Sequence, residues 1–257
     1  MIFPVGDEQI EGGAKPIFSY SFIAVNILVY LFQVSVPGGL ICEFGVIPND
    51  ILNGEGYVTL LTSMFMHGGW MHLIGNMLFL WVFADNIEAT VGNFNFVIFY
   101  LLGGLAASAI HIYFNTGFDI VNCCEPCQVS GLHCGQGDRP CPGMIPSIGA
   151  SGALSAVMGA YMVMFPRSKV KVLVVYLFST FRMAAIWFLG LWIGQQLIAG
   201  FAALGPETAA TDGVAWWAHI GGFGFGVLAG LVARKGGMGH PWRKNGPDGK
   251  VSIRDYV

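Results

Sequence analysis

The sequence predicts an all-α, polytopic membrane protein, a bundle of six membrane-spanning helices. Of its 257 residues, 54% are hydrophobic and only 11% are charged, and the mean hydropathy is +0.63. Soluble domains carry about 25% charged residues, so this composition cannot supply a fully water-facing surface. The net charge of −3 gives no reason to expect nucleic acid as a partner. The partner that the composition implies is the lipid bilayer.

Six stretches are apolar over roughly the 20 residues that a helix needs to cross a bilayer. They cover residues 17–36, 70–86, 94–114, 145–165, 183–203 and 213–233. The polar, acidic stretch before the first of them lacks the features of a cleavable signal peptide, so we interpret the first helix as a retained span. Residues 58–66 are apolar but too short to cross, which predicts a re-entrant or interfacial segment in the first outward loop.

The distribution of positive charge predicts the orientation. Six spans place both termini on one side, and every lysine and arginine except Arg139 falls on that side. Because cytoplasmic loops are enriched in these residues, both termini are predicted to be cytoplasmic. This divides the chain into a cytoplasmic segment (1–16), a six-span domain (17–235) and a polar cytoplasmic tail (236–257). A bacterial inner (plasma) membrane is the expected location.

Four polar residues lie at a similar predicted depth below the outer surface. Ser151 and His219 each fall about six residues into an inward-running span, as does Asn76. His72 and Asn76 are four residues apart and therefore share one helical face. Polar groups inside a membrane must be paired or face water, so they indicate a functional site by default.

Small residues recur at four-residue spacing in the two spans that carry Ser151 and His219. They are Gly222, Gly226 and Gly230 in the sixth span and Ser151, Ser155 and Gly159 in the fourth. Small residues at this spacing let helix backbones approach closely in lipid. We therefore expect the serine hydroxyl to lie within reach of the imidazole.

These residue types are suited to nucleophilic catalysis. A histidine next to a serine can take its proton during attack and return it to the leaving amine. Asn76, the ring of His72 and the backbone N–H of Ser151 could donate hydrogen bonds to the developing oxyanion. We find no carboxylate in the sequence that is placed to orient His219, which predicts a dyad.

Six cysteines fall in the predicted outward loops: Cys42, Cys123, Cys124, Cys127, Cys134 and Cys141. An even number on an oxidising exterior favours disulfides. The alternative is a structural zinc site formed by Cys124, Cys127, Cys134 and Cys141, with His133 as a further candidate ligand. Either would staple the Cys-rich insert at 118–142, which could also shape substrate entry. No other cofactor is expected.

Three motifs together resemble those of the rhomboid family of intramembrane serine proteases. His67 to Asn76, with His72 between them, resembles the family's His-x4-His-x3-Asn signature. Gly149-Ala-Ser151-Gly152 resembles Gly-x-Ser-Gly, and the Ala-His-x-Gly-Gly pattern is found around His219. The resemblance runs along most of the chain, from about residue 26 to residue 234.

The resemblance implies a role for each of these residues. Ser151 would be the nucleophile and His219 the general base, His72 and Asn76 would line the oxyanion hole, and His67, Gly149 and Gly152 would support them. The substrate would be a transmembrane helix of another protein, cut near its outward end. A catalytically silent relative that binds membrane helices is the alternative.

One position departs from the family pattern. Some relatives carry an aromatic residue four positions after the nucleophile, where it packs on the catalytic imidazole. Here that position is Ser155. We therefore expect another side chain to hold His219, with Trp216 and Trp217 as candidates.

Overall fold

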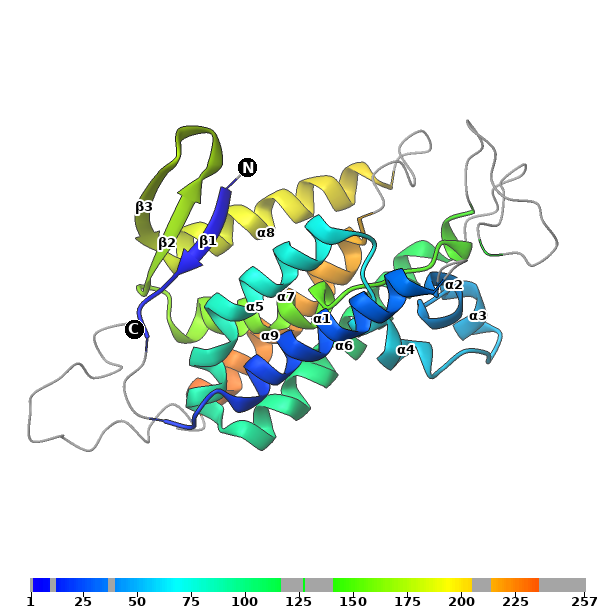
Figure 1. Cartoon of the computed structure of the whole chain (residues 1–257), viewed down its shortest axis with the longest axis horizontal. Helices are drawn as coiled ribbons and strands as arrows, with labels where there is room; N and C mark the ends of the chain where they lie inside the picture. Colours follow the sequence, from blue (N-terminus) through cyan, green and yellow to red (C-terminus); the bar gives the residue numbers. More distant parts are fainter. Residues whose placement is uncertain are drawn as a thin grey trace, which may run out of the picture.

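The computed structural model describes residues 2–9, 13–36, 40–116, 127, 141–204 and 214–235. Within them, the longer helices pack into one bundle (Figure 1). They are α1 (Ile17–Ser35), α5 (Trp70–Val91), α6 (Asn93–Asn115), α7 (Ser151–Met164), α8 (Ala185–Ala202) and α9 (Trp216–Lys235). The predicted tail at 236–257 and most of the loop at 204–212 lie outside the described residues.

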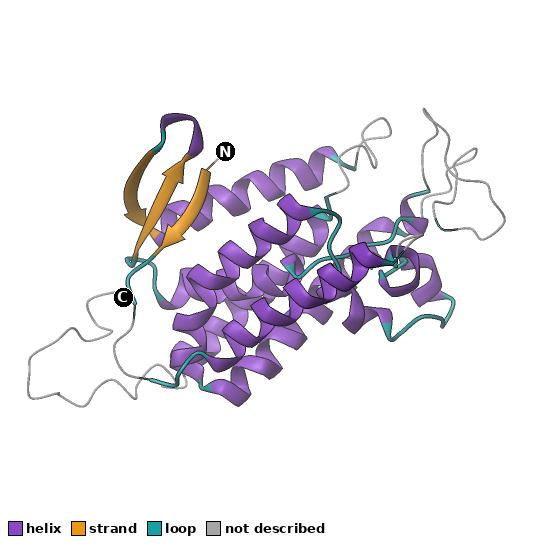
Figure 2. Ribbon diagram, viewed as in Figure 1, coloured by secondary structure: helices purple, strands orange, loops and turns teal. Residues whose placement is uncertain are grey.

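Short helices occupy one end of the bundle and a small sheet occupies the other (Figures 1 and 2). The short helices are α2 (Ile41–Phe44), α3 (Pro48–Leu52), α4 (Thr59–Thr62), η1 (Ser63–Phe65) and η2 (Pro142–Met144). The sheet consists of β1 (Ile2–Gly6), β2 (Lys169–Val174) and β3 (Ser179–Ala184), with η3 (Val175–Leu177) between the last two strands.

Four helices, α1, α6, α8 and α9, are long and apolar enough to cross a membrane. The helix α7 is apolar but has only 14 residues, or about 21 Å at 1.5 Å per residue. The helix α5 has 22 residues and buries Asp85, Asn86 and Glu88 close to its end. The chain is therefore a mostly helical integral membrane protein.

The helix predicted over residues 145–165 begins later than expected, at Ser151. The preceding segment is held in a non-helical conformation by backbone hydrogen bonds to Val46 and Ser63. Ser147 and Val46 exchange two backbone hydrogen bonds of 2.9 and 2.8 Å, and the Gly149 N–H donates to the Ser63 carbonyl at 2.8 Å. Gly149 has a φ of +123°, which a residue with a side chain rarely adopts. Those bonds explain why the apolar run was wrongly extended to residue 145.

The prediction of an all-α fold was incomplete because three segments form an antiparallel sheet. The hairpin of β2 and β3 lies in the predicted inner loop, and β1 pairs with β2 from the predicted N-terminal segment. In β2, Lys169 and Lys171 are exposed, whereas Val170 and Val172 are fully buried in the main core. This alternation has the period of two that is typical of a strand with one buried face.

A carboxylate of α5 fixes the start of α1. Glu88 is fully buried, and its two oxygens accept the backbone N–H groups of Phe18 at 2.9 Å and Ser19 at 2.7 Å, as well as the Ser19 hydroxyl at 2.6 Å. The first N–H groups of a helix have no partner within the helix, and their partial positive charge favours an anion. The interaction satisfies both groups and joins the two helices.

The backbones of α7 and α9 are in direct contact. A Cβ atom on Gly226 would lie 1.9 Å from the Ala156 carbonyl oxygen, and one on Gly222 would lie 2.1 Å from that of Gly152. Likewise, a Cβ on Gly159 would lie 2.2 Å from the Phe223 carbonyl oxygen. The predicted close approach of these two helices is therefore present, and glycine is required on both sides of it.

We expect Gly226→Ala to lower the free energy of unfolding by about 1–3 kcal/mol, because the added methyl group overlaps a backbone carbonyl. Gly224→Ala is the matched control: it lies two residues away on the same helix, and its Cβ would meet nothing within 4 Å. Thermal unfolding in detergent measures both. Equal transitions for the two variants would contradict the contact.

The segment after β1 is anchored through Asp7 to the end of the bundle that carries the sheet (Figure 1). Its Oδ2 atom accepts hydrogen bonds from the Tyr161 hydroxyl and from Asn86 Nδ2 at 2.7 Å. Burial raises the pKa of Asp7 to about 7; the hydrogen bond from Tyr161 opposes the shift and the nearby charge of Asp85 adds to it. The folded protein therefore holds a proton on Asp7 near neutral pH that the unfolded chain has lost.

This raised pKa predicts stability that increases as pH falls. The contribution is complete below the unfolded value of 3.8 and is lost as pH rises through about 7. The unfolding temperature in detergent should therefore be higher at about pH 6 than at about pH 8, and Asp7→Asn should reduce the difference. Glu55→Gln, which removes an exposed carboxylate, should leave the difference intact. An unchanged difference in Asp7→Asn would exclude Asp7 as its source.

Candidate active site

Ser151 and His219 meet where α7 and α9 begin. Ser151 is the first residue of α7, and His219 lies in the first turn of α9. The Nε2 atom of His219 lies 2.9 Å from the Ser151 hydroxyl oxygen. Both are therefore closer to the helix ends than the six residues expected from sequence. They share a depth because both helices begin at the same end of the bundle.

Gln196 of α8 orients the histidine, and sequence reasoning missed it. Its Oε1 atom lies 2.7 Å from His219 Nδ1, and its side chain is buried. An amide oxygen can only accept, so Nδ1 carries the proton of the neutral ring and Nε2 presents its lone pair to Ser151. The search for a carboxylate overlooked this neutral amide. The sequence did contain a signal, because Gln195 and Gln196 are polar residues inside a predicted membrane span and such residues indicate a functional site.

Two tryptophan rings border the imidazole of His219. The Trp192 ring centroid lies 5.7 Å from that of His219, and the Trp216 ring meets it edge-on at 6.4 Å. Trp216 was one of the two candidates from sequence. The other, Trp217, instead stacks on Phe114 of α6 at 3.6 Å. Trp192 was not anticipated because it comes from α8, a different helix.

His72 lies beside the serine. A Cβ atom on Gly149 would be 2.8 and 2.9 Å from His72 Cε1 and Nε2, and 3.5 Å from the Ser151 hydroxyl oxygen. The Gly68 N–H donates to His72 Nδ1 at 3.3 Å, so the neutral ring carries its proton on Nε2. That N–H therefore lies on the Ser151 side of the ring. Glycine is required at position 149 because other residues rarely adopt its positive φ and because a side chain would collide with the His72 ring.

Asn76 and His67 form a buried pair next to the His72 ring, whose centroid lies 5.2 Å from that of His67. Asn76 Nδ2 lies 3.1 Å from His67 Nε2, which leaves the second amide hydrogen of Asn76 free for another acceptor. Gln33 of α1 holds the backbone of His67 with two hydrogen bonds, of 2.7 and 3.1 Å. His67 thus connects the segment before α5 to both α1 and α5.

Gly152 and Ser155 support the start of α7. A Cβ on Gly152 would lie 2.7 Å from the Cβ of Ala107 in α6, so the position has no room for a larger residue. The Ser155 hydroxyl donates to the Ser151 carbonyl oxygen at 2.6 Å. The Ser155 hydroxyl thus binds its own helix backbone.

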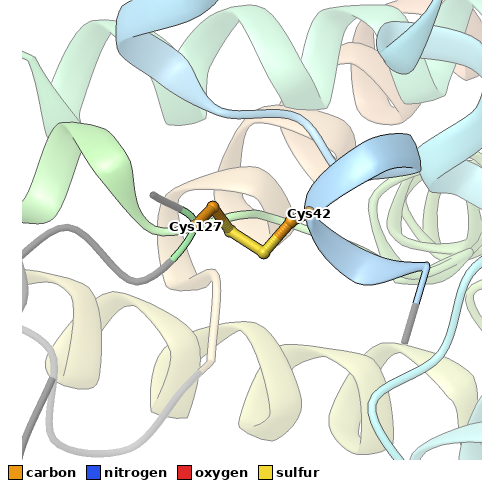
Figure 3. Close-up of a disulfide and its surroundings, with 2 residues drawn as sticks. All are labelled: Cys42 and Cys127. Atoms are coloured by element: carbon orange, nitrogen blue, oxygen red, sulfur yellow. A yellow bond between two sulfur atoms is a disulfide. The ribbon is translucent and has the colours of Figure 1, made fainter. Parts of the chain in front are cut away.

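The cysteines form disulfides where the structure describes them. Cys42 of α2 is bonded to Cys127 with an S–S distance of 2.01 Å (Figure 3), and Cys141 is also disulfide-bonded. The zinc alternative required Cys127 and Cys141 as free thiolates, so the structure favours the disulfide interpretation. Cys123, Cys124, Cys134 and His133 lie outside the described residues, as does most of the insert at 118–142.

The geometry defines a serine–histidine pair of the serine-hydrolase type within a membrane helix bundle. The model of the family described as "Rhomboid domain" matches residues 54–236, which is more than half of the chain. The chain belongs to the rhomboid family, whose members are in general intramembrane serine proteases.

Similar proteins come from bacteria and mitochondria. Rhomboid protease GluP of Bacillus subtilis is 28% identical over 153 residues, which cover 58% of this chain and 24% of the relative. Rhomboid protein 1, mitochondrial, of Saccharomyces cerevisiae is 25% identical over 222 residues, which cover 84% and 53%. Presenilin-associated rhomboid-like protein A, mitochondrial, of Danio rerio is 25% identical over 190 residues, which cover 73% and 39%. The chain thus spans about half the length of these relatives or less.

We expect Gln196→Leu to slow the labelling of Ser151 by a fluorophosphonate about ten-fold, which corresponds to about 1.4 kcal/mol in the barrier. Without the amide oxygen, nothing holds the ring proton of His219 on Nδ1. In the tautomer that carries the proton on Nε2, this nitrogen cannot accept the hydroxyl proton of Ser151. Gln195→Leu is the control, since its side chain is exposed on the same helix. Equal labelling rates in the two variants would contradict an orienting role.

Proposed function

We propose that this protein is an intramembrane serine endopeptidase that hydrolyses peptide bonds in the transmembrane helices of other membrane proteins, near their outward ends. One observation carries the proposal: His219 is hydrogen-bonded on both sides. Its Nε2 atom lies 2.9 Å from the Ser151 hydroxyl oxygen, and its Nδ1 atom lies 2.7 Å from Gln196 Oε1. A proton on His219 Nδ1, donated to Gln196 Oε1, leaves the Nε2 lone pair facing the Ser151 hydroxyl, as a nucleophile and its base require. Family membership supports the same reaction class.

The reaction follows from these contacts. The Ser151 oxygen attacks the carbonyl carbon of the scissile bond while its proton passes to His219 Nε2. The resulting imidazolium keeps its Nδ1 hydrogen bond to Gln196 and then gives the Nε2 proton to the leaving amine. A water molecule next loses a proton to the same nitrogen and hydrolyses the acyl-enzyme. Ser151 and His219 are partly exposed, which permits water and an unwound substrate to reach them.

Several donors could stabilise the oxyanion. Ser151 is the first residue of α7, so its backbone N–H has no acceptor within that helix, and the positive end of the helix dipole lies at the same place. His72 contributes an Nε2–H beside Gly149, and Asn76 retains one amide hydrogen. Removal of a single such donor typically costs about 2.7–4 kcal/mol of transition-state stabilisation.

The proposal includes a topology of six spans with a re-entrant or interfacial first outward loop and both termini in the cytoplasm. Arg234 and Lys235 at the end of α9 and the basic residues of the α7–α8 connection support this orientation. The disulfide between Cys42 and Cys127 lies at the opposite end, which suits an oxidising exterior. A bacterial plasma membrane is the proposed location.

We expect Ser151→Ala to reduce cleavage of single-span membrane proteins by at least about 10³-fold, because the nucleophile is lost. Ser21→Ala removes an exposed hydroxyl that bonds its own helix backbone in α1 and should retain most of the activity. Cleavage by the purified protein in vesicles is measured by gel mobility, and the cut sites by mass spectrometry. A folded wild-type chain that binds these helices and cleaves none of them would instead establish the catalytically silent alternative.

A further inference from the structure

The hairpin of β2 and β3 has an apolar tip that nothing in the described structure covers. Tyr176 is 80% exposed, Leu177 is 72% exposed and Phe178 is 91% exposed. Phe178 has a φ of +45°, a left-handed conformation that is unfavourable for a bulky residue and that glycine would adopt at lower cost. The turn thus holds an exposed aromatic ring where steric preference alone favours glycine.

One face of the same hairpin is basic. Lys171 and Arg182 are directly opposite each other in the β2–β3 register, and both are exposed. Like charges opposed across two strands destabilise the pair. Across the described part of the chain, no carboxylate lies within salt-bridge distance of either side chain. Glu8 lies nearby, but its carboxylate accepts the backbone N–H of Lys169 at 3.0 Å. Among the described residues, the two cations therefore have no ion-pair partner.

The position of the hairpin relates both features to the membrane. It projects sideways from the bundle at the end opposite the Cys42–Cys127 disulfide (Figure 1), and six-residue strands extend about 20 Å. The strand β3 continues directly into α8, where Trp187 at the third position is 69% exposed. Exposed tryptophans gather at the membrane–water interface. The exposed Trp187 therefore supports a position of the hairpin base at the depth of the headgroups.

We infer that this hairpin is a membrane-surface anchor that binds anionic lipid. The ring of Phe178 and its apolar neighbours enter the leaflet at this end of the bundle, and the opposed cations Lys171 and Arg182 bind lipid phosphates. Aromatic and aliphatic side chains combined with basic ones are typical of interfacial membrane-binding elements. Anionic headgroups also supply negative charge that offsets the repulsion between the opposed Lys171 and Arg182. The inference is independent of any catalytic activity.

Photocrosslinking tests the anchor. The full chain, carrying p-benzoylphenylalanine in place of Phe178, is reconstituted in vesicles of equimolar phosphatidylcholine and phosphatidylglycerol, irradiated and analysed by intact-mass spectrometry. We expect lipid adducts in which phosphatidylglycerol exceeds phosphatidylcholine about five-fold or more, given the attraction per cation near an anionic surface. The double variant Lys171→Gln, Arg182→Gln should keep the adducts and bring the ratio close to one.

Lys15→Gln is the matched control for charge. It removes one exposed cation just before α1 and outside the hairpin, and it should leave the lipid ratio at the tip unchanged. Adducts with a second copy of the chain, or no adducts with either lipid, would overturn the inference. A ratio that the double variant does not change would overturn it as well.

Discussion

The backbone contact between α7 and α9 is the constraint on which the site depends. Ser151 and His219 are 68 residues apart in sequence, and only the approach of their helices brings them within a hydrogen bond. Helices in lipid gain little from the hydrophobic effect, so close packing must supply the attraction. Gly222 contacts the backbone of Gly152. Gly152 directly follows Ser151 in sequence, and Gly222 lies three residues after His219. A side chain there would separate the two reactive groups directly.

Buried polar groups fix the other helices around this contact. Glu88 binds the first N–H groups of α1, and Gln33 at the far end of the same helix binds the backbone of His67. An unpaired polar group in a low dielectric is costly, so each of these pairs favours one register of α1 against α5. The positions of His67, Asn76 and His72 follow from that register.

The sequence was sufficient to predict a mostly helical membrane protein and the approach of Ser151 to His219, because both depend on composition and on helical periodicity. It was not sufficient to predict where α7 begins. Residues 145–150 are apolar enough to continue the helix, but hydrogen bonds from Val46 and Ser63, about 100 and 90 residues earlier, hold them extended. The strands of the small sheet were missed because a search for spans of about 20 residues averages over the two-residue alternation of Lys169 to Val172.

Gln196 and Trp192 were missed for a related reason. Both contact His219 from α8, and which residues of α8 face His219 depends on the rotation of that helix about its own axis. In the proposed reaction, the glutamine takes the place that a carboxylate could occupy. A carboxylate at this position would stabilise the imidazolium more strongly, but burying its charge near lipid would carry a large desolvation cost. A neutral amide fixes the same tautomer and avoids that cost. The proposed mechanism therefore relies on the tautomer of His219 and on geometry. In it, the positive end of α7 and the donors His72 and Asn76 balance the charge that develops on the substrate.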